Sequence, residues 1–285
     1  KKRILVKGPV LTQSGYGEQS RFALRALRSR EDIFDIYIQP IRWGNTGWIW
    51  TDDEFRKWMD EKTIKTQILA QQQKLQVDMT LQVTIPDEFQ KMSEFDIGYT
   101  AGIETTKAAP KWLQKGNEID KILVVSSHSR DSYVNTKVVA VNNSTGEEVP
   151  YSLETPVEVV HEITPRAEPD PIEELSLSTD FNFLLMSQWS PRKNLENSIK
   201  WWVEEFHDKD VGLVVKTNMS KNSLMDYNLT TNVLQKLLSE HKDRKCKIYL
   251  LHGDLSEGQL TWLYQHDKIK GMINISHGEG FGLPL

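Results

Sequence analysis

Short apolar runs alternate with amphipathic segments along the first half of the chain. Strands are predicted where Val, Ile and Leu cluster, at residues 3–7, 34–38, 79–85, 96–99 and 121–125. Helices are predicted at residues 18–28, 52–75 and 109–117. Residues 138–151 have the pattern of a β-hairpin with its turn at residues 142–146. Repeated strand–helix units predict a parallel sheet with helices on both faces.

The second half repeats the same alternation. Strands are predicted at residues 181–186, 211–216, 247–251 and 271–275. Helices are predicted at residues 195–206 and 228–240. Ser256 followed by Gln259 has the spacing of a capping box, which predicts a third helix start. The second half therefore predicts another parallel α/β sheet.

Three prolines between residues 164 and 171 separate the two halves. We therefore expect an N-terminal Rossmann-like domain at residues 1–163, a linker at 164–178 and a C-terminal domain at 179–285. In such α/β sheets ligands bind beyond the carboxyl ends of the strands, and with two domains in the cleft between them.

Composition narrows the function classes. The chain has 285 residues and a formal charge of −5, which argues against an extended nucleic-acid surface but leaves room for a small cationic pocket. Cys246 is the single cysteine, so no disulfide or thiolate metal cluster forms within this chain. No apolar run reaches the ~20 residues of a membrane span, and the first residues lack the pattern of a signal peptide. The expected compartment is the cytoplasm, and the missing initiator Met indicates a trimmed frame.

A glycine-rich stretch, SHGEGFGLPL, follows the last apolar run, at residues 276–285. Gly278, Gly280 and Gly282 let the backbone turn sharply and approach a ligand, so that N–H groups at the start of the next helix can point at an anion. A phosphate would repel Glu279, so this side chain is expected to point at a neutral polyol. The combination predicts a sugar attached to a phosphate.

This stretch, with the run before it, resembles the donor-site signature of retaining GT-B glycosyltransferases of family four. Residues 186–195 are similar to the segment whose basic residues hold the donor phosphates, and residues 251–256 with Tyr264 resemble the segment beside the nucleobase. Residues 98–105 and 125–130 look like the acceptor-domain pattern. The resemblance implies a GT-B architecture, two Rossmann-like domains facing a cleft, with a truncated C-terminal domain, because the motif's second Glu would fall two residues beyond Leu285.

The resemblance also implies a reaction: metal-independent transfer of a sugar from a UDP- or GDP-linked donor to an acceptor hydroxyl, with retention. Glu279 would be the catalytic residue. The implied donor-binding residues are Arg192, Lys193, Gly280, Phe281, Gly282, Leu283, Gly15 and Gly17. On the acceptor side the implied residues are Glu104 and His128. Relatives usually carry Gly-Arg where this chain has Ser187 and Gln188, so Arg192 is the expected replacement for the missing cation.

No cofactor or metal is expected besides the donor substrate. His161-Glu162 lacks the second His of a zinc-binding H-E-x-x-H motif. The expected partners are a nucleotide sugar and a carbohydrate, lipid or protein acceptor, with no nucleic acid and with peripheral membrane contact left open.

Two other functions remain open at the level of sequence. Gly15-Tyr-Gly-Glu-Gln-Ser20 is close to the G-x-G-x-x-G motif of NAD-dependent oxidoreductases, with Asp35 20 residues further on, although the third glycine is absent. A catalytically inactive, truncated sugar-nucleotide-binding remnant is the other alternative.

Trp43, Trp48 and Trp50 cluster in a predicted loop, where they could stack on sugar rings.

Overall fold

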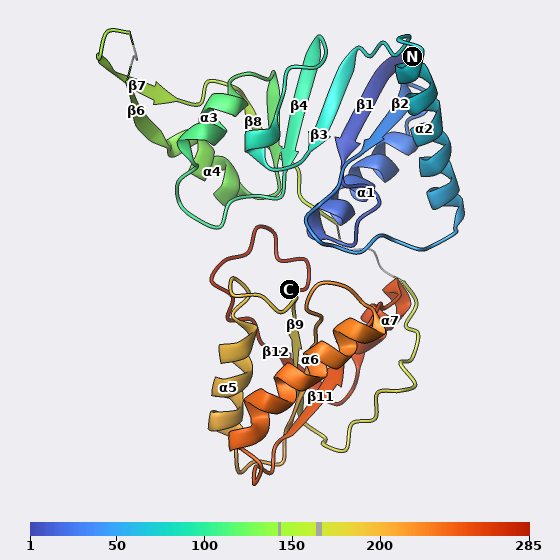
Figure 1. Cartoon of the computed structure of the whole chain (residues 1–285), viewed down its shortest axis with the longest axis vertical. Coiled ribbons are helices and arrows are strands. Elements are labelled where there is room, and N and C mark those ends of the chain that lie inside the picture. The colour runs from blue at the N-terminus through green and yellow to red at the C-terminus, as the bar shows by residue number, and fades with distance from the viewer. Residues whose placement is uncertain (142–143, 164–166) are drawn as a thin grey trace. The chain divides into compact units, whose positions relative to one another are not determined.

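The computed structural model describes residues 1–141, 144–163 and 167–285. The chain divides into two compact units, Lys1–Ile163 and Thr164–Leu285, here called the N-unit and the C-unit (Figure 1). The first three residues of the predicted linker, 164–166, lie outside the described residues. Within the rest of that segment, Ile172 and Leu177 are buried in a hydrophobic core of the C-unit.

The N-unit is built on a six-stranded, fully parallel sheet with the order β2-β1-β3-β4-β5-β8. Its strands are β1 (Lys2–Gly8), β2 (Phe34–Pro40), β3 (Met79–Val83), β4 (Phe95–Thr100), β5 (Lys121–Val124) and β8 (Val157–Val159). The first five match the predicted strands to within two residues at each end. Because all the strands are parallel, the loops that follow them emerge at the same end of the sheet, here called its carboxyl edge (Figure 1).

The helices of the N-unit are α1 (Gly15–Arg28), α2 (Glu54–Gln71), α3 (Pro110–Gly116), α4 (Ser127–Asn135) and a 3-10 turn at Pro86–Glu88. The sequence did not predict α4, because its polar residues show no apolar periodicity. Its start is fixed locally, since the Ser126 hydroxyl accepts from the Ser129 amide at 3.1 Å, and its packing is fixed by the buried Tyr133. β8 has three residues and was also not predicted.

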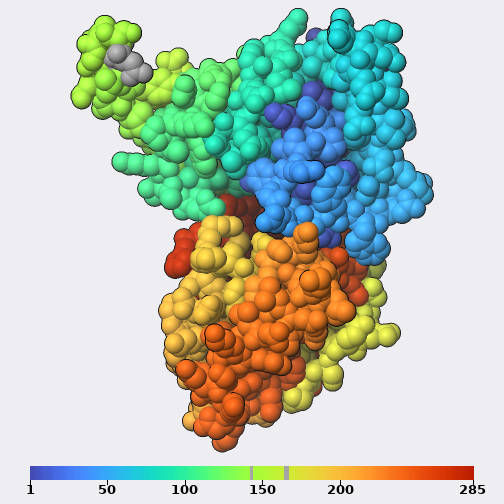
Figure 2. Space-filling view, in the orientation of Figure 1, coloured from blue at the N-terminus to red at the C-terminus, as the bar shows by residue number. Residues whose placement is uncertain are grey.

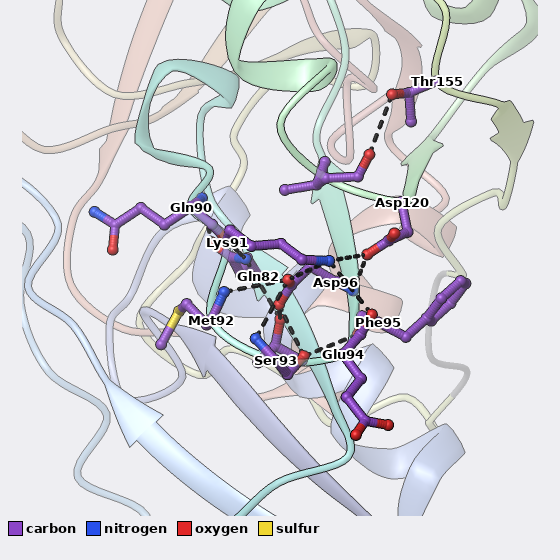
Figure 3. Close-up of polar contacts among 12 residues, drawn as sticks. Gln82, Gln90, Lys91, Met92, Ser93, Glu94, Phe95, Asp96, Asp120 and Thr155 are labelled. Atoms are coloured by element: carbon purple, nitrogen blue, oxygen red, sulfur yellow. Dashed lines mark hydrogen bonds and ion pairs between the residues drawn. The ribbon is translucent and has the colours of Figure 1, made fainter.

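A buried carboxylate fixes the connection between β3 and β4 (Figure 3). Asp96, at the amino end of β4, accepts from the Met92 amide at 3.1 Å and from the Ser93 hydroxyl at 2.9 Å. Lys91 lies 3.3 Å from Asp96 and 2.6 Å from Asp120. Burial raises the pKa of Asp96, but these hydrogen bonds outweigh it and the net pKa lies below the ordinary value. This cluster stabilises the amino edge of the N-unit sheet, opposite to the carboxyl edge where the predicted acceptor-side residues Glu104 and His128 lie.

A two-stranded hairpin extends from the N-unit. β6 (Lys137–Val141) and β7 (Glu148–Ser152) pair antiparallel, with Val139 opposite Pro150, so the predicted hairpin is confirmed. Residues 142–143 of its predicted turn lie outside the described residues. Figure 2 shows the hairpin as a protrusion of the N-unit.

The C-unit holds a four-stranded parallel sheet with the order β11-β10-β9-β12. Its strands are β9 (Asn182–Met186), β10 (Gly212–Lys216), β11 (Lys247–Leu251) and β12 (Ile269–Met272). Its helices are α5 (Leu195–Phe206), α6 (Leu224–Leu237), which continues as a 3-10 turn at Leu238–Glu240, and α7 (Glu257–Gln265). The capping box at Ser256 and Gln259 is confirmed, because both of its hydrogen bonds are present.

The end of the chain differs from the prediction in two ways. β12 begins two residues earlier than predicted and ends at Met272, because the Asn274 side chain accepts from the Ser276 amide at 2.9 Å and turns the backbone out of the sheet. Residues 273–285 contain no helix, so the helix start predicted for the glycine-rich stretch is not formed within them. A single turn bond, from the Leu285 amide to the Gly282 carbonyl at 2.7 Å, closes this stretch.

Candidate functional site

Two basic residues and a carboxylate meet at the carboxyl edge of the C-unit sheet. Lys193 forms an ion pair with Glu279, and the Arg192 guanidinium donates to the Gly278 carbonyl at 2.6 Å. The Arg192 guanidinium also lies 3.9 Å from the Glu279 carboxylate. The structure therefore brings together the three predicted residues Arg192, Lys193 and Glu279, which we call the cation–carboxylate cluster. Glu279 was expected to point at a neutral polyol, whereas its carboxylate contacts Lys193.

Hydrogen bonds hold the loop that carries Arg192 and Lys193 against the loop that carries Glu279. Asn194 takes a left-handed conformation, with φ of 53°, directly before α5. Its side chain donates to the Ile275 carbonyl at 3.1 Å, and the His277 amide donates to the Arg192 carbonyl at 2.9 Å. The loop that follows β9 is thus hydrogen-bonded to the loop that follows β12.

The cluster is largely withdrawn from water, since the side chains of Lys193 and Glu279 are 17% and 18% exposed. Burial raises the pKa of Glu279, but the hydrogen bond and charge of Lys193 outweigh that effect and bring the net pKa below the ordinary value. Glu279 is therefore ionised at neutral pH and neutralises Lys193. An anionic ligand would have to displace this carboxylate to reach the ammonium group.

The glycine-rich residues beyond the cluster make a compact turn. Gly282 has φ of 81°, and a Cβ there would lie 3.1 Å from Leu285, so glycine is favoured on both counts. Phe281 is exposed, and Gly280 and Leu283 are partly exposed. These four predicted donor-binding residues, Gly280, Phe281, Gly282 and Leu283, lie on one continuous loop beside Glu279.

A second set of polar contacts joins the loops that follow β10 and β11. The buried Asp226 accepts from the Met219 amide at 2.9 Å, from the Ser220 amide at 3.0 Å and from His252 Nε2 at 2.8 Å. Burial raises the pKa of Asp226, but the hydrogen bonds from His252 and from the backbone amides outweigh this effect. The net pKa therefore lies below the ordinary value. Sequence analysis missed this residue, although Ser223 and Asp226 have the spacing of a helix cap, and the Ser223 hydroxyl does accept from the Asp226 amide at 3.2 Å.

The predicted nucleobase segment is fixed by two more contacts. Lys216, at the end of β10, donates to the Gly253 carbonyl at 2.6 Å, and its burial lowers the pKa of its ammonium group. The Tyr264 hydroxyl donates to the Pro284 carbonyl at 2.8 Å. The segment after β11 and the glycine-rich end of the chain therefore belong to one connected edge of the C-unit.

In the N-unit, Gly15 and Gly17 form the first turn of α1, directly after the loop from β1. The Ser14 hydroxyl caps this helix by accepting from the Gly17 amide at 3.0 Å. A Cβ at Gly17 would lie 2.9 Å from the Thr12 hydroxyl and closer still to the Thr12 carbonyl oxygen, whereas a Cβ at Gly15 would meet nothing within 4 Å. Packing alone explains glycine at position 17. It does not explain glycine at position 15, where a ligand could approach.

Because of these surroundings, alanine is expected to destabilise the fold at position 17 and to leave its stability nearly unchanged at position 15. Gly17→Ala is expected to lower the free energy of unfolding by about 1–3 kcal/mol, because the new methyl group collides with the Thr12 backbone. Gly15→Ala is expected to change it by less than about 0.5 kcal/mol, since the site is open and alanine favours helix. Urea denaturation of both variants measures this difference. Equal destabilisation would contradict the packing argument.

The predicted acceptor-side residues lie on facing segments of the N-unit. His128, on α4, contacts the Thr105 carbonyl at 3.1 Å through Nε2, which ties α4 to the loop after β4. Glu104 is exposed on that same loop. Burial raises the pKa of Tyr16 to about 12, and the charge of Glu104 contributes to this shift. Both predicted residues therefore lie at the carboxyl edge of the sheet, and the contact of His128 is with the backbone.

The buried carboxyl group of Glu162, at the same edge, was not predicted from the sequence. Glu162 is buried, and burial together with the charge of Glu18 raises its pKa to about 7. Gln19 is also buried, and its amide lies near the Tyr99 hydroxyl without forming a hydrogen bond of normal geometry. No sequence signal marks Glu162, because the residues around it have neither helical nor strand periodicity. Across the described residues, no three His, Cys, Asp or Glu side chains are grouped so that they could hold a metal ion.

Comparison with known proteins gives the fold. No family model matches the chain, and a search of curated proteins finds no relative. Among solved structures, the apo form of OtsA matches with a TM-score of 0.57 at 12% identity, covering 98% of this chain and 79% of that one. The chain has the GT-B glycosyltransferase fold. At this identity the likeness establishes the fold and no further property.

Two more structures with this fold bear on the proposal below. One is a trehalose-6-phosphate synthase, solved in work on enzymatic glycosyltransfer with retention, with a TM-score of 0.52 at 11% identity and coverage of 99% of this chain and 79% of that one. The other is HepE from Anabaena in complex with UDP and glucose, with a TM-score of 0.50 at 10% identity and coverage of 97% and 74%. These neighbours give no support to the oxidoreductase alternative. Among the described residues, no helix has the length and apolar character needed to cross a bilayer.

Proposed function

We propose that the protein is a retaining, metal-independent glycosyltransferase that moves a sugar from a UDP- or GDP-linked donor to an acceptor hydroxyl. The observation that carries this proposal is the cation–carboxylate cluster, which lies at the carboxyl edge of the C-unit sheet in a chain with the GT-B fold. In open α/β sheets this edge is where ligands bind. The cytoplasm is the proposed compartment.

The proposed reaction requires fixed positive charge near the departing diphosphate. When the bond between the sugar and the diphosphate breaks, negative charge grows on the leaving oxygen, and preorganised cations and dipoles stabilise it best. Lys193 and Arg192 supply this charge, and the backbone of residues 280–283 follows their partner Glu279 directly in the chain. Glu279, released from Lys193 when the diphosphate binds, orients sugar hydroxyls and stabilises positive charge on the ring.

Further predicted contacts lie on other loops of the C-unit and, separately, on the N-unit. The loops after β10 and β11, held together by Asp226 and Lys216, would form the wall beside the nucleobase. In the N-unit, Gly15 would allow close approach of the donor or acceptor, and Glu104 with His128 would contact the acceptor. Support for retention comes from the resemblance of the glycine-rich motif and from the trehalose-6-phosphate synthase with the same fold.

A thermal-shift screen of UDP, GDP and NADH tests the proposal. A ligand that binds only the native state stabilises it by about 2.7 kcal/mol at a concentration of 100 Kd. We expect UDP or GDP to raise the melting temperature of the chain and NADH to leave it unchanged. A shift with NADH alone would overturn the proposal. Nucleotide binding without release of sugar from UDP- or GDP-sugars in the presence of acceptors would instead identify an inactive remnant.

A further inference from the structure

Two tryptophans are exposed on the loop between β2 and α2 of the N-unit. Trp48 and Trp50 are 55% and 73% exposed, while Ile49 between them packs against the hydrophobic core. Figure 1 shows this loop leaving the end of β2 at the strands' carboxyl edge. Large apolar side chains exposed together mark a binding surface more often than a structural one.

Backbone hydrogen bonds hold this loop rigidly. The Ile49 amide donates to the Leu11 carbonyl at 2.8 Å, and the Gln13 amide donates to the Gly47 carbonyl at 2.9 Å. An isolated antiparallel bridge joins Trp48 to Thr12. The tryptophan loop is thus pinned to the loop after β1, which leads directly into Gly15 at the start of α1.

The two exposed tryptophans alternate with a partly buried isoleucine, which is the pattern of a segment whose alternate side chains share a face. In an extended segment, residues two apart point to the same side and lie roughly 6–7 Å apart along the chain. A side-chain contact also connects the loop to α1, because the Trp43 and Tyr16 rings lie 4.4 Å apart between centroids. Trp48 and Trp50 are therefore two exposed tryptophans close together in the chain, on a loop at the carboxyl edge of the N-unit sheet.

We propose that Trp48 and Trp50 form a carbohydrate-stacking platform for the acceptor, which makes the acceptor an oligosaccharide rather than a lipid or a protein. This inference rests on the proposed function and specifies its acceptor. Tryptophan combines a large apolar face with a polar N–H and suits ligands that are apolar on one side and hydrated on the other. Sugar rings have this character.

The charges beside the platform favour a carbohydrate over a membrane surface. After Thr51 come the exposed acidic residues Asp52, Asp53 and Glu54, of which Asp53 also caps α2 and Asp52 lies 3.8 Å from Lys57. Carboxylates accept hydrogen bonds from sugar hydroxyls and repel the anionic headgroups of phospholipids. The rigid anchoring of the loop also lowers the entropy cost of binding, because little backbone has to be ordered.

Ligand-detected NMR with a panel of neutral trisaccharides tests the platform. The probes are maltotriose, cellotriose, mannotriose and chitotriose, added to the full chain. We expect at least one of them to bind, and we expect Trp48→Ala and Trp50→Ala each to weaken that binding by about tenfold. Trp48→Phe and Trp50→Phe keep an aromatic face and are expected to stay within about threefold of the unchanged chain.

The matched control is Trp201→Ala, which removes a half-exposed tryptophan from α5 of the C-unit and should leave trisaccharide binding unchanged. The proposal is overturned if no trisaccharide of the panel binds, if the alanine variants bind as well as the unchanged chain, or if anionic phosphatidylglycerol vesicles bind in place of the sugars through these tryptophans. UDP thermal shifts on the same variants separate this inference from the proposed function. A normal UDP shift with no sugar binding rejects the platform alone, whereas sugar binding without any nucleotide shift rejects the donor site alone.

Discussion

Replacing Lys193 by glutamine is expected to weaken UDP binding by about 10- to 100-fold. The ammonium group of Lys193 is largely buried beside Glu279, where its charge acts at low effective dielectric. A charge-assisted hydrogen bond to phosphate contributes about 1.5–3 kcal/mol, and every 1.4 kcal/mol is a factor of ten in affinity. Calorimetric titration with UDP measures the loss, and circular dichroism checks that the fold is retained.

Glu279→Gln is the matched partner in this experiment. It removes the carboxylate that competes with the diphosphate for Lys193, so UDP affinity is expected to stay the same or rise. Sugar transfer should nevertheless fall by about 100-fold or more, because a neutral amide no longer stabilises positive charge on the sugar ring. Equal UDP affinity in the unchanged chain, Lys193→Gln and Glu279→Gln would show that the cation–carboxylate cluster is structural.

The partners in this cluster were predicted from the sequence, but their contact was not. Lys193 and Glu279 are 86 positions apart, and no local pattern connects them. They meet because β12 adds to the sheet beside β9, with Ile269 opposite Asn182, which places the loops after these two strands side by side. Strand order is a property of the whole sheet, and the alternation of strands and helices does not encode it.

Local signals predicted the elements that depend on local chemistry. The capping box at Ser256 predicted the start of α7, and the apolar run at residues 211–216 predicted β10 within one residue. α4 was missed because it depends on packing of Tyr133 in the finished sheet, and β8 because it is too short to show a period. Asp226 carried a capping signal, yet its bond to His252 could be seen only in the fold.

Glu162 shows most clearly what the sequence could not reveal. In the sequence the His161-Glu162 pair has only the pattern of an incomplete zinc motif, and the burial of Glu162 follows from the position of the segment after β8. Burial and the neighbouring Glu18 raise the pKa of Glu162 to about 7 from an ordinary value of 4.5. Between pH 4.5 and about 7 the native state therefore keeps a proton on Glu162 that the unfolded chain has already released.

This difference fixes the sign of a pH effect on stability. The contribution of Glu162 is fully present below pH 4.5, declines as the pH rises, and is lost above about pH 7. With 1.36 kcal/mol for each pKa unit, the shift from 4.5 to about 7 makes the loss about 3 kcal/mol. Glu162→Gln keeps a neutral side chain at all pH values. The variant is therefore expected to be as stable as the unchanged chain near pH 4 and about 3 kcal/mol more stable at pH 8.

Urea denaturation of both proteins at pH 4, 6 and 8 measures this effect, because the difference between them cancels the contributions of other titrating groups. Glu18→Gln is the control for charge alone: the Glu18 side chain is 47% exposed and paired with Arg21, so its removal should alter stability much less. A constant difference between the unchanged chain and Glu162→Gln across this pH range would mean that Glu162 is ionised in the native state. The carboxyl edge of the N-unit would then carry a full negative charge at Glu162 at neutral pH.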